Sequence, residues 1–366
     1  MIIQINKPFL PEKEAYNQLI SKIWDNQWLT NSGPYAVDLE FLLKKRFDVN
    51  QLLFVSSGTM ALQISIAALE LEGEIITTPF SFIATTTSII WQNCTPVFTD
   101  IDPHSLNIDA TKIEASITPR TSAIIATHVY GNPCDITLIE SIAKKHGLKV
   151  IYDGAHAFDV KYNNESIFNA GDISICSLHA SKIYHSTEGG FIALNNHEIG
   201  GKIARIRNFG FTSPTTFKEL GINGKNSEFH AAMGLANYPH IESIIEKRRS
   251  LTEKYDELLN DLSVSKPVWN NKGTKNYAYY PLIFNEEKTM LDLMDFLQKE
   301  GVFTRRYFYP SLANSLDFLP KQSLAVTDDI AKRVLCLPLY FDLSLQNVER
   351  ICNLIEKFFL MPKNNS

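Results

Sequence analysis

The sequence predicts an α/β protein in which a large domain, with a mainly parallel sheet covered by helices on both faces, joins a smaller α+β C-terminal domain. Two patterns predict this fold. Short β-rich runs alternate with longer helical patterns through the first two thirds of the chain, and this alternation stops near residue 240. The length of 366 residues and the hydrophobic content of 45% provide enough apolar surface for two cores.

Seven apolar runs have the length and composition of buried strands. They are LLFVSS (52–57), EIITTP (74–79), TPVFTDI (95–101), SAIIATHVY (122–130), LKVIYDGA (148–155), DISICSL (172–178) and GGFIAL (189–194). Helical patterns lie between them, for example at 58–71 after Ser57, and at 135–147, which begins with an aspartate that can cap a helix and ends at Gly147. Such βα units place successive strands parallel to one another.

The pattern changes at about residue 240. A long, charged, amphipathic helix is predicted over residues 240–262, and it is followed by a strand pattern at 277–284. Further helices are predicted at 291–302 and before Phe359. We therefore expect a large domain over residues 1–240 and a small C-terminal domain over residues 241–366.

Composition and charge exclude several classes of protein. The 40 acidic and 35 basic residues give a net charge of -5 without a long like-charge block, which argues against a nucleic-acid partner. No apolar run reaches the roughly 18 residues of a membrane span, and the first residues lack a signal-peptide pattern, so we expect a cytoplasmic protein. Five widely spaced cysteines and nine histidines show no ligand spacing, and we expect neither disulfides nor a metal.

Common nucleotide and hydrolase motifs are also missing. The chain has no G-x-x-x-x-G-K-[ST], no G-x-G-x-x-G and no G-x-S-x-G segment, which disfavours ATP, nicotinamide and hydrolase functions. Polar and aromatic residues do, however, gather after predicted strands, where open α/β sheets bind their ligands.

Two of these groups follow the first two strands. Gly58 and Thr59 lie at the start of a helix, where free N–H groups suit a phosphate, although ordinary helix capping explains the same pattern. Phe80 and Phe82 follow the second strand. Aromatic residues there either belong to the core or stack on a planar ring.

Two further groups follow later strands. Asp153 comes after an apolar strand and precedes His156, and an aspartate in that place either caps a turn or has a functional role. Ser177 and Lys182 belong to the segment SLHASKIYHSTEGG (177–190). A lysine in so crowded a segment is expected to be buried, which favours the neutral amine.

Together, these groups match the requirements of pyridoxal 5'-phosphate (PLP). PLP needs an anion site, an aromatic side chain on its ring, a carboxylate beside its pyridine nitrogen and a lysine that forms a Schiff base. The sequence supplies all four in a plausible order. We therefore predict a PLP site in which Lys182 is a nucleophile instead of a surface charge.

Five ordered segments carry a family resemblance. They are SSGTMAL, PFSFIAT, IYDGAHAF, SLHASKIYHSTEGG and GINGKNSEFHAAMGLANYPHIESIIEKRR. With them the chain resembles the nucleotide-sugar aminotransferases of the DegT/DnrJ/EryC1/StrS family, which have the PLP-dependent aspartate-aminotransferase fold (fold type I). The resemblance implies that Lys182 forms the Schiff base, that Asp153 pairs with the pyridine nitrogen and that Phe82 stacks on the ring.

The resemblance also assigns the rest of the cofactor site. It implies that His156 lies near the ring hydroxyl, and that Gly58, Thr59 and Ser177 hold the phosphate. Asn223 would reach the phosphate of the neighbouring subunit's cofactor, because the family builds its active sites at the interface of a homodimer.

Three positions bear on how closely the chain follows the family. Gly154 stands where alanine is usual, and Lys225 where arginine is common, but neither change removes a chemical function. Relatives that dehydrate sugars carry histidine at the place of Lys182, so the lysine favours transamination over a PLP-dependent sugar dehydratase. A non-catalytic, cofactor-dependent regulator would need a DNA-binding segment, and the sequence has no spare basic stretch for one.

The resemblance further implies L-glutamate as amino donor. The segments HASKIYHSTEGG, NFGF, GINGKNSEF and RRYFYP resemble the subgroup that converts dTDP-4-keto-6-deoxy-D-glucose to dTDP-4-amino-4,6-dideoxy-D-glucose, a precursor of O-antigen sugars. A 3-keto-6-deoxysugar remains the alternative acceptor, although 3-keto enzymes tend to carry a YPxKNLG-like segment that this chain lacks. Thr30, Ser32 and Tyr309 are candidate sugar contacts, although turn chemistry or a packed bend explains each of them too.

Overall fold

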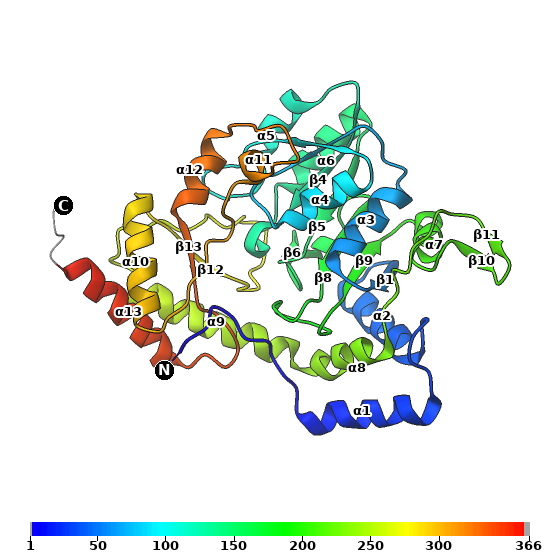
Figure 1. Ribbon diagram of the computed structural model, residues 1–366, viewed down its shortest axis with the longest axis horizontal. Coiled ribbons are helices and arrows are strands. Elements are labelled where there is room, and N and C mark those ends of the chain that lie inside the picture. The colour runs from blue at the N-terminus through cyan, green and yellow to red at the C-terminus, as the bar shows by residue number, and fades with distance from the viewer. Residues whose placement is uncertain (1, 362–366) are drawn as a thin grey trace.

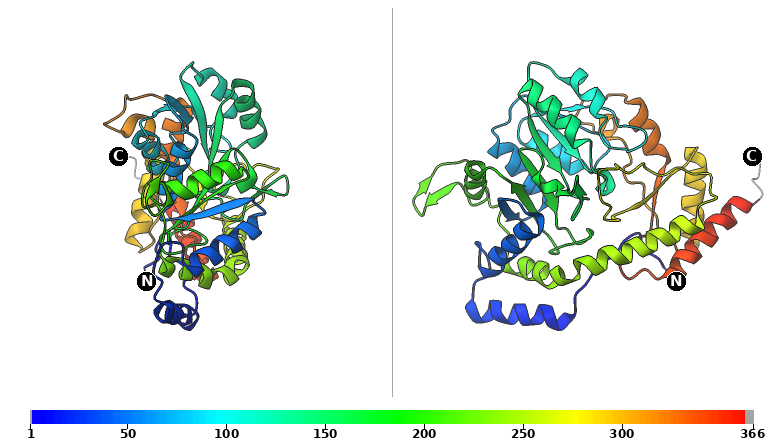
Figure 2. Two further views of the ribbon diagram at one scale, coloured as in Figure 1. Left: turned by 90° about the vertical axis from the view of Figure 1, so that its right-hand side faces the viewer. Right: turned by 180° about the vertical axis from the view of Figure 1, so that it is seen from behind.

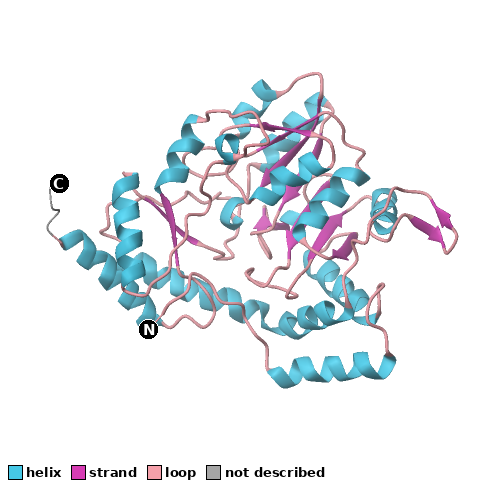
Figure 3. Ribbon diagram, in the orientation of Figure 1, coloured by secondary structure: helices cyan, strands magenta, loops and turns pink. Residues whose placement is uncertain are grey.

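A seven-stranded sheet forms the centre of the computed structural model, which describes residues 2–361 (Figures 1 and 3). The strands lie in the order β1-β9-β8-β5-β4-β2-β3. They are β1 (Gln51–Val55), β2 (Glu74–Thr77), β3 (Thr95–Phe98), β4 (Thr121–Thr127), β5 (Lys149–Asp153), β8 (Ile173–Ser177) and β9 (Gly190–Leu194). Only β9 runs antiparallel to its neighbours, so the predicted mainly parallel sheet is confirmed.

Helices cover both faces of this sheet, and the alternation of side chains along each strand explains why. In β4, Ile124 and Ala126 enter one apolar core, whereas Ala123 and Ile125 enter the other. The first core is closed by α2 (Pro34–Phe47) and α6 (Ile136–His146), and the second by α3 (Gly58–Ala68) and α7 (His197–Ile206). Because both faces are buried, the strands read as continuous apolar runs.

The ends of α6 agree with the residues predicted to cap it. The Asp135 side chain accepts a hydrogen bond from the Leu138 N–H at 3.1 Å. At the other end Gly147 adopts a left-handed backbone with φ 67°, a conformation that glycine adopts without steric cost.

The C-terminal part has a core of its own. Its strands β12 (Tyr280–Ile283) and β13 (Val334–Leu337) are antiparallel and pack with α9 (Ile241–Leu258), α10 (Glu287–Lys299) and α13 (Leu345–Leu360). The long helix α9 runs from the large sheet toward this core (Figures 1 and 2). The N-terminal residue Ile3 also packs there, and its N–H bonds to the carbonyl of Gly301. A boundary at residue 240 stays a prediction, and the last five residues of the range 241–366 lie outside the described part.

The remaining elements decorate this frame. They are α1 (Lys13–Asn26), α4 (Ile83–Trp91), α5 (Ala110–Ile113), β6 (Lys161–Tyr162), β7 (Glu165–Ser166), β10 (Phe211–Ser213), β11 (Thr216–Phe217), α8 (Glu228–Asn237), α11 (Leu312–Ser315), α12 (Ala325–Arg333) and four 3-10 turns, η1 (Glu114–Ser116), η2 (Val129–Gly131), η3 (Ile167–Asn169) and η4 (Tyr238–His240). Helix α1 and the β10–β11 hairpin extend away from the sheet (Figures 1 and 2). Within residues 2–361, no helix combines the length and the apolar character that crossing a membrane requires.

Candidate active site

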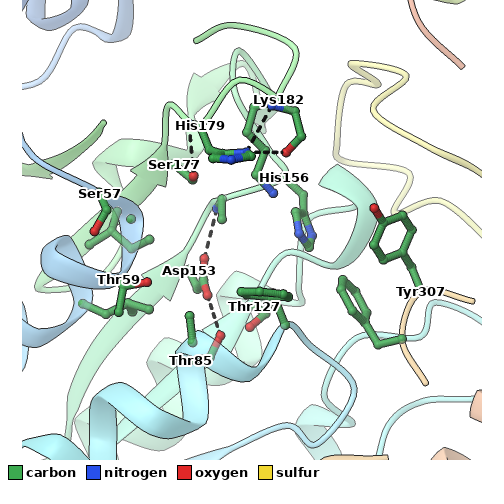
Figure 4. A pocket seen from close by; sticks show the side chains of 18 of the residues that line it. Ser57, Thr59, Thr85, Thr127, Asp153, His156, Ser177, His179, Lys182 and Tyr307 are labelled. Carbon is green, nitrogen blue, oxygen red and sulfur yellow. Dashed lines mark hydrogen bonds between the residues drawn. The ribbon is translucent and has the colours of Figure 1, made fainter. Parts of the chain in front are cut away.

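A cavity of about 360 Å³ lies at the carboxyl ends of the parallel strands. Three of its lining residues, Thr127, Asp153 and Ser177, are the last residues of β4, β5 and β8. Seven of the predicted site residues line this cavity together: Gly58, Thr59, Phe82, Asp153, His156, Ser177 and Lys182. Figure 4 shows the polar members of this group turned toward one common space.

The start of α3 forms one wall of the cavity. The Ser57 Oγ caps the helix by accepting a hydrogen bond from the Met60 N–H at 3.0 Å. A Cβ atom added to Gly58 would lie 3.0 Å from the Ser177 Cβ, so only glycine lets the helix start approach the end of β8 this closely. The free N–H groups of this first turn lie beside the hydroxyl groups of Thr59 and Ser177, which together suit an anion.

The glycine pair of the segment SLHASKIYHSTEGG supports this wall from behind. Gly190 pairs with Val55 on one side and with Ser177 on the other, which brings the ends of β1 and β8 together. A Cβ atom on Gly190 would lie 2.6 Å from the carbonyl carbon of Ser57. The glycine is therefore needed for close packing under the helix start.

Asp153 lies at the floor of the cavity and is almost fully buried. Its Oδ2 accepts a hydrogen bond from the Thr85 Oγ1 at 2.7 Å, and its Oδ1 accepts one from the Ala155 N–H at 3.0 Å. Burial raises the pKa of Asp153, while these two hydrogen bonds and the positive charge of Lys182 act in the opposite direction. The carboxylate is thus fixed at both oxygens and is ready to pair with a cation.

Lys182 lies in the irregular segment between β8 and β9, where its N–H bonds to the carbonyl of His179 at 2.9 Å. Burial lowers the pKa of its ammonium group, and the opposing effect of the Asp153 charge is smaller. A larger fraction of the amine is therefore neutral, which is the state that a nucleophile requires.

His156 faces the cavity from the opposite side of Asp153. Its ring stacks on Phe308 with the centroids 5.4 Å apart, and it meets the edge of Tyr279 at 5.1 Å. Burial, with the nearby charge of Lys182, lowers the pKa of the imidazole well below its usual value, so the ring is neutral. Within the described residues its buried Nδ1 has no hydrogen-bond partner, which points to a polar group of a bound molecule.

Sequence reasoning missed the part of the cavity that the C-terminal domain supplies. Tyr279, Arg305, Tyr307 and Phe308 line it, together with Thr85 of α4. The available signal for the first group was the segment RRYFYP (305–310), and that for Thr85 was its place in PFSFIAT.

Four predicted residues lie outside the lining of this cavity. The ring of Tyr309 packs against the guanidinium of Arg306, 3.4 Å from its centroid. Thr30 and Ser32 are exposed in the loop between α1 and α2. Asn223 pairs with Asn208 in an isolated bridge and accepts a hydrogen bond from the Lys225 Nζ at 2.6 Å. Because Asn223 is assigned to the neighbouring subunit's site, its role stays a prediction, as do the three sugar contacts.

The lining residues fit PLP. The helix start with Ser177 suits the phosphate, the anchored Asp153 suits the pyridine nitrogen, the unpartnered His156 Nδ1 suits the ring hydroxyl, and the neutral Lys182 suits the aldehyde. The fold and this cavity define a PLP-dependent enzyme with the aspartate-aminotransferase fold.

Known proteins identify the family. The chain belongs to the DegT/DnrJ/EryC1/StrS aminotransferase family, whose sequence profile matches residues 11–356. It is 38% identical to the dTDP-4-amino-4,6-dideoxy-D-glucose transaminase of Shigella dysenteriae (97% of this chain, 98% of the relative). It is 37% identical to the Escherichia coli enzyme of the same name (96% and 98%). The crystal structure of DesI in the presence of its TDP-sugar product superimposes with a TM-score of 0.92 at 30% identity (97% and 92%).

Proposed function

We propose that this aminotransferase transfers the amino group of L-glutamate to C4 of dTDP-4-keto-6-deoxy-D-glucose and so makes dTDP-4-amino-4,6-dideoxy-D-glucose. The similarity to two relatives of that name over nearly the whole of each chain supports the acceptor. The buried, neutral Lys182 beside Asp153 is the observation that carries the chemistry, because a dehydratase of this family has histidine in place of that lysine.

When bound, PLP supplies an electron-withdrawing ring that stabilises negative charge on the carbon that carries the amino group. Asp153 holds the proton of the pyridine nitrogen through its fixed carboxylate, which keeps the ring electron-poor. The Lys182 Nζ, once released from the cofactor, takes the proton from the α-carbon of the donor. In the second half-reaction the same nitrogen delivers a proton to C4 of the sugar.

The experiment follows the two half-reactions separately. Purified protein loaded with PLP and mixed with L-glutamate alone is expected to release one equivalent of 2-oxoglutarate per site and to lose its visible absorption band. Adding the 4-keto sugar nucleotide should restore the band and give a product whose NMR spectrum has nitrogen at C4. Initial-rate plots at several glutamate concentrations should be parallel. Amination of a dTDP-3-keto-6-deoxysugar in preference, or loss of a hydroxyl group without amination, would contradict the proposal.

We also propose that two subunits share their active sites. A single chain leaves large apolar side chains exposed, among them Phe82 at the mouth of the cavity (57% exposed), Phe217 on the hairpin (66%) and Leu220 beside it (98%). Surfaces of this kind mark interfaces in soluble proteins. The hairpin and Asn223 adjoin in sequence, so a partner that covers the hairpin would bring its cavity close to Asn223.

Mixing two defective variants tests the shared site. Lys182→Ala lacks the nucleophile, and Asn223→Ala is expected to bind PLP more weakly. If Asn223 acts across the interface, a heterodimer of the two contains one site with both Lys182 and Asn223 intact, and activity should reappear after subunit exchange. Sedimentation should report a dimer for both variants. If exchange is complete and the mixture stays at the sum of the two separate activities, Asn223 does not act on the partner's site.

A further inference from the structure

Arg305 lines the same cavity as Lys182 but reaches it from the C-terminal domain. Its backbone is held by a two-way bridge to Cys336 of β13, with N···O distances of 3.2 and 2.8 Å. Its guanidinium lies over the ring of Tyr307, 5.1 Å from the centroid, and Tyr307 also lines the cavity. The backbone and the aromatic ring therefore hold this cation at the wall of the cavity.

The side chain of Arg305 has no anionic partner among residues 2–361 and donates no hydrogen bond to them. Its sequence neighbour differs. The Arg306 Nη2 donates to the Glu287 Oε1 at 2.8 Å and to the Lys332 carbonyl at 2.9 Å. The first of these two adjacent arginines is thus an uncompensated charge at the cavity, and the second is a structural ion pair outside it.

The carboxylates that line the cavity are already engaged elsewhere. Asp153 is bound by Thr85 and Ala155, and the Glu188 Oε1 lies 3.6 Å from the His179 Nε2. The planar fork of an arginine matches a carboxylate or phosphate group through two parallel hydrogen bonds. An unpaired arginine at the wall of a partly closed cavity therefore indicates a site for an oxyanion of the substrate.

We propose that Arg305 binds a carboxylate of the amino donor. This inference rests on the aminotransferase function proposed above. The donor's α-carboxylate is bonded to the carbon whose amino group must meet Lys182, so it has to lie within the same small cavity. A diphosphate of the sugar nucleotide offers similar oxygens, but it is separated from the reacting C4 by the sugar ring. The carboxylate is therefore the oxyanion that Arg305 is better placed to meet.

The test compares Arg305→Gln with Arg306→Gln as the matched control, because the two positions are adjacent and both lose one guanidinium. Stopped-flow absorbance measures the glutamate half-reaction and the sugar half-reaction separately, and calorimetry measures the binding of glutarate, an unreactive dicarboxylate. For Arg305→Gln we expect the apparent Kd for glutamate and for glutarate to rise about 10- to 100-fold. The rate at saturating glutamate and the affinity for PLP should change less than about threefold, as should all constants of Arg306→Gln.

Each other outcome is informative. An unchanged glutamate Kd in Arg305→Gln overturns the proposal, and so does an equal loss in both half-reactions. A loss confined to the sugar nucleotide assigns Arg305 to the diphosphate and overturns the carboxylate assignment. Arg305→Lys keeps the charge without the fork and is expected to recover part of the glutarate affinity, which also provides a test if the glutamine variant folds poorly. Because the glutamate steps are read without any sugar, failure of the proposed acceptor leaves this test intact.

Discussion

Replacing Lys182 with alanine is expected to lower the rate of both half-reactions by at least about 10⁴-fold, since one nitrogen serves as covalent anchor and as proton carrier. The burial that lowers the pKa of Lys182 also means that a surface lysine cannot substitute for it. Borohydride reduction of the PLP-loaded protein, followed by peptide mass spectrometry, should place the cofactor mass on Lys182 in the wild type and nowhere specific in the variant.

The control for this prediction is Lys288→Ala. Lys288 is highly exposed on α10 and pairs with Asp292 at 2.9 Å, so its loss should leave the half-reactions and the reduced adduct unchanged. Both variants should melt within a few degrees of the wild type. A Lys182→Ala protein that still converts glutamate at a tenth of the normal rate would show that another group moves the proton.

Replacing Asp153 with asparagine is expected to slow both half-reactions by about 10²- to 10³-fold, which is the usual effect of removing one well-placed electrostatic group. Asparagine keeps the size of the side chain and can still accept the hydrogen bond from Thr85, but it carries no charge to hold the proton on the pyridine nitrogen. Single-turnover absorbance with glutamate measures this loss, and reduction with borohydride checks that PLP is still attached.

Thr85 provides a graded comparison for Asp153. Thr85→Val removes the hydroxyl that bonds to the Asp153 Oδ2 while keeping the shape of the side chain, and we expect a loss of about tenfold. Thr85→Ser keeps the hydroxyl and should stay near wild type. If Asp153→Asn retained more than a tenth of the wild-type rate, the carboxylate would not have the role proposed for it.

The sequence by itself determined the sheet and half of the cavity. Each of the seven strands was visible as an apolar run, because burial on both faces leaves no polar positions. Gly58, Asp153, Ser177 and Lys182 lie at or just after the ends of such runs. Parallel strands end at one edge of a sheet, so the local pattern was enough to bring these residues together.

The tertiary structure alone decided the other half. Thr85 meets Asp153, 68 residues away, because α4 packs beside the sheet. Within RRYFYP, the structure turns Arg305, Tyr307 and Phe308 toward the cavity and packs Tyr309 on Arg306. A pattern of neighbours along the chain records which residues can be buried, but which of them face a given cavity depends on how two separate cores pack against each other.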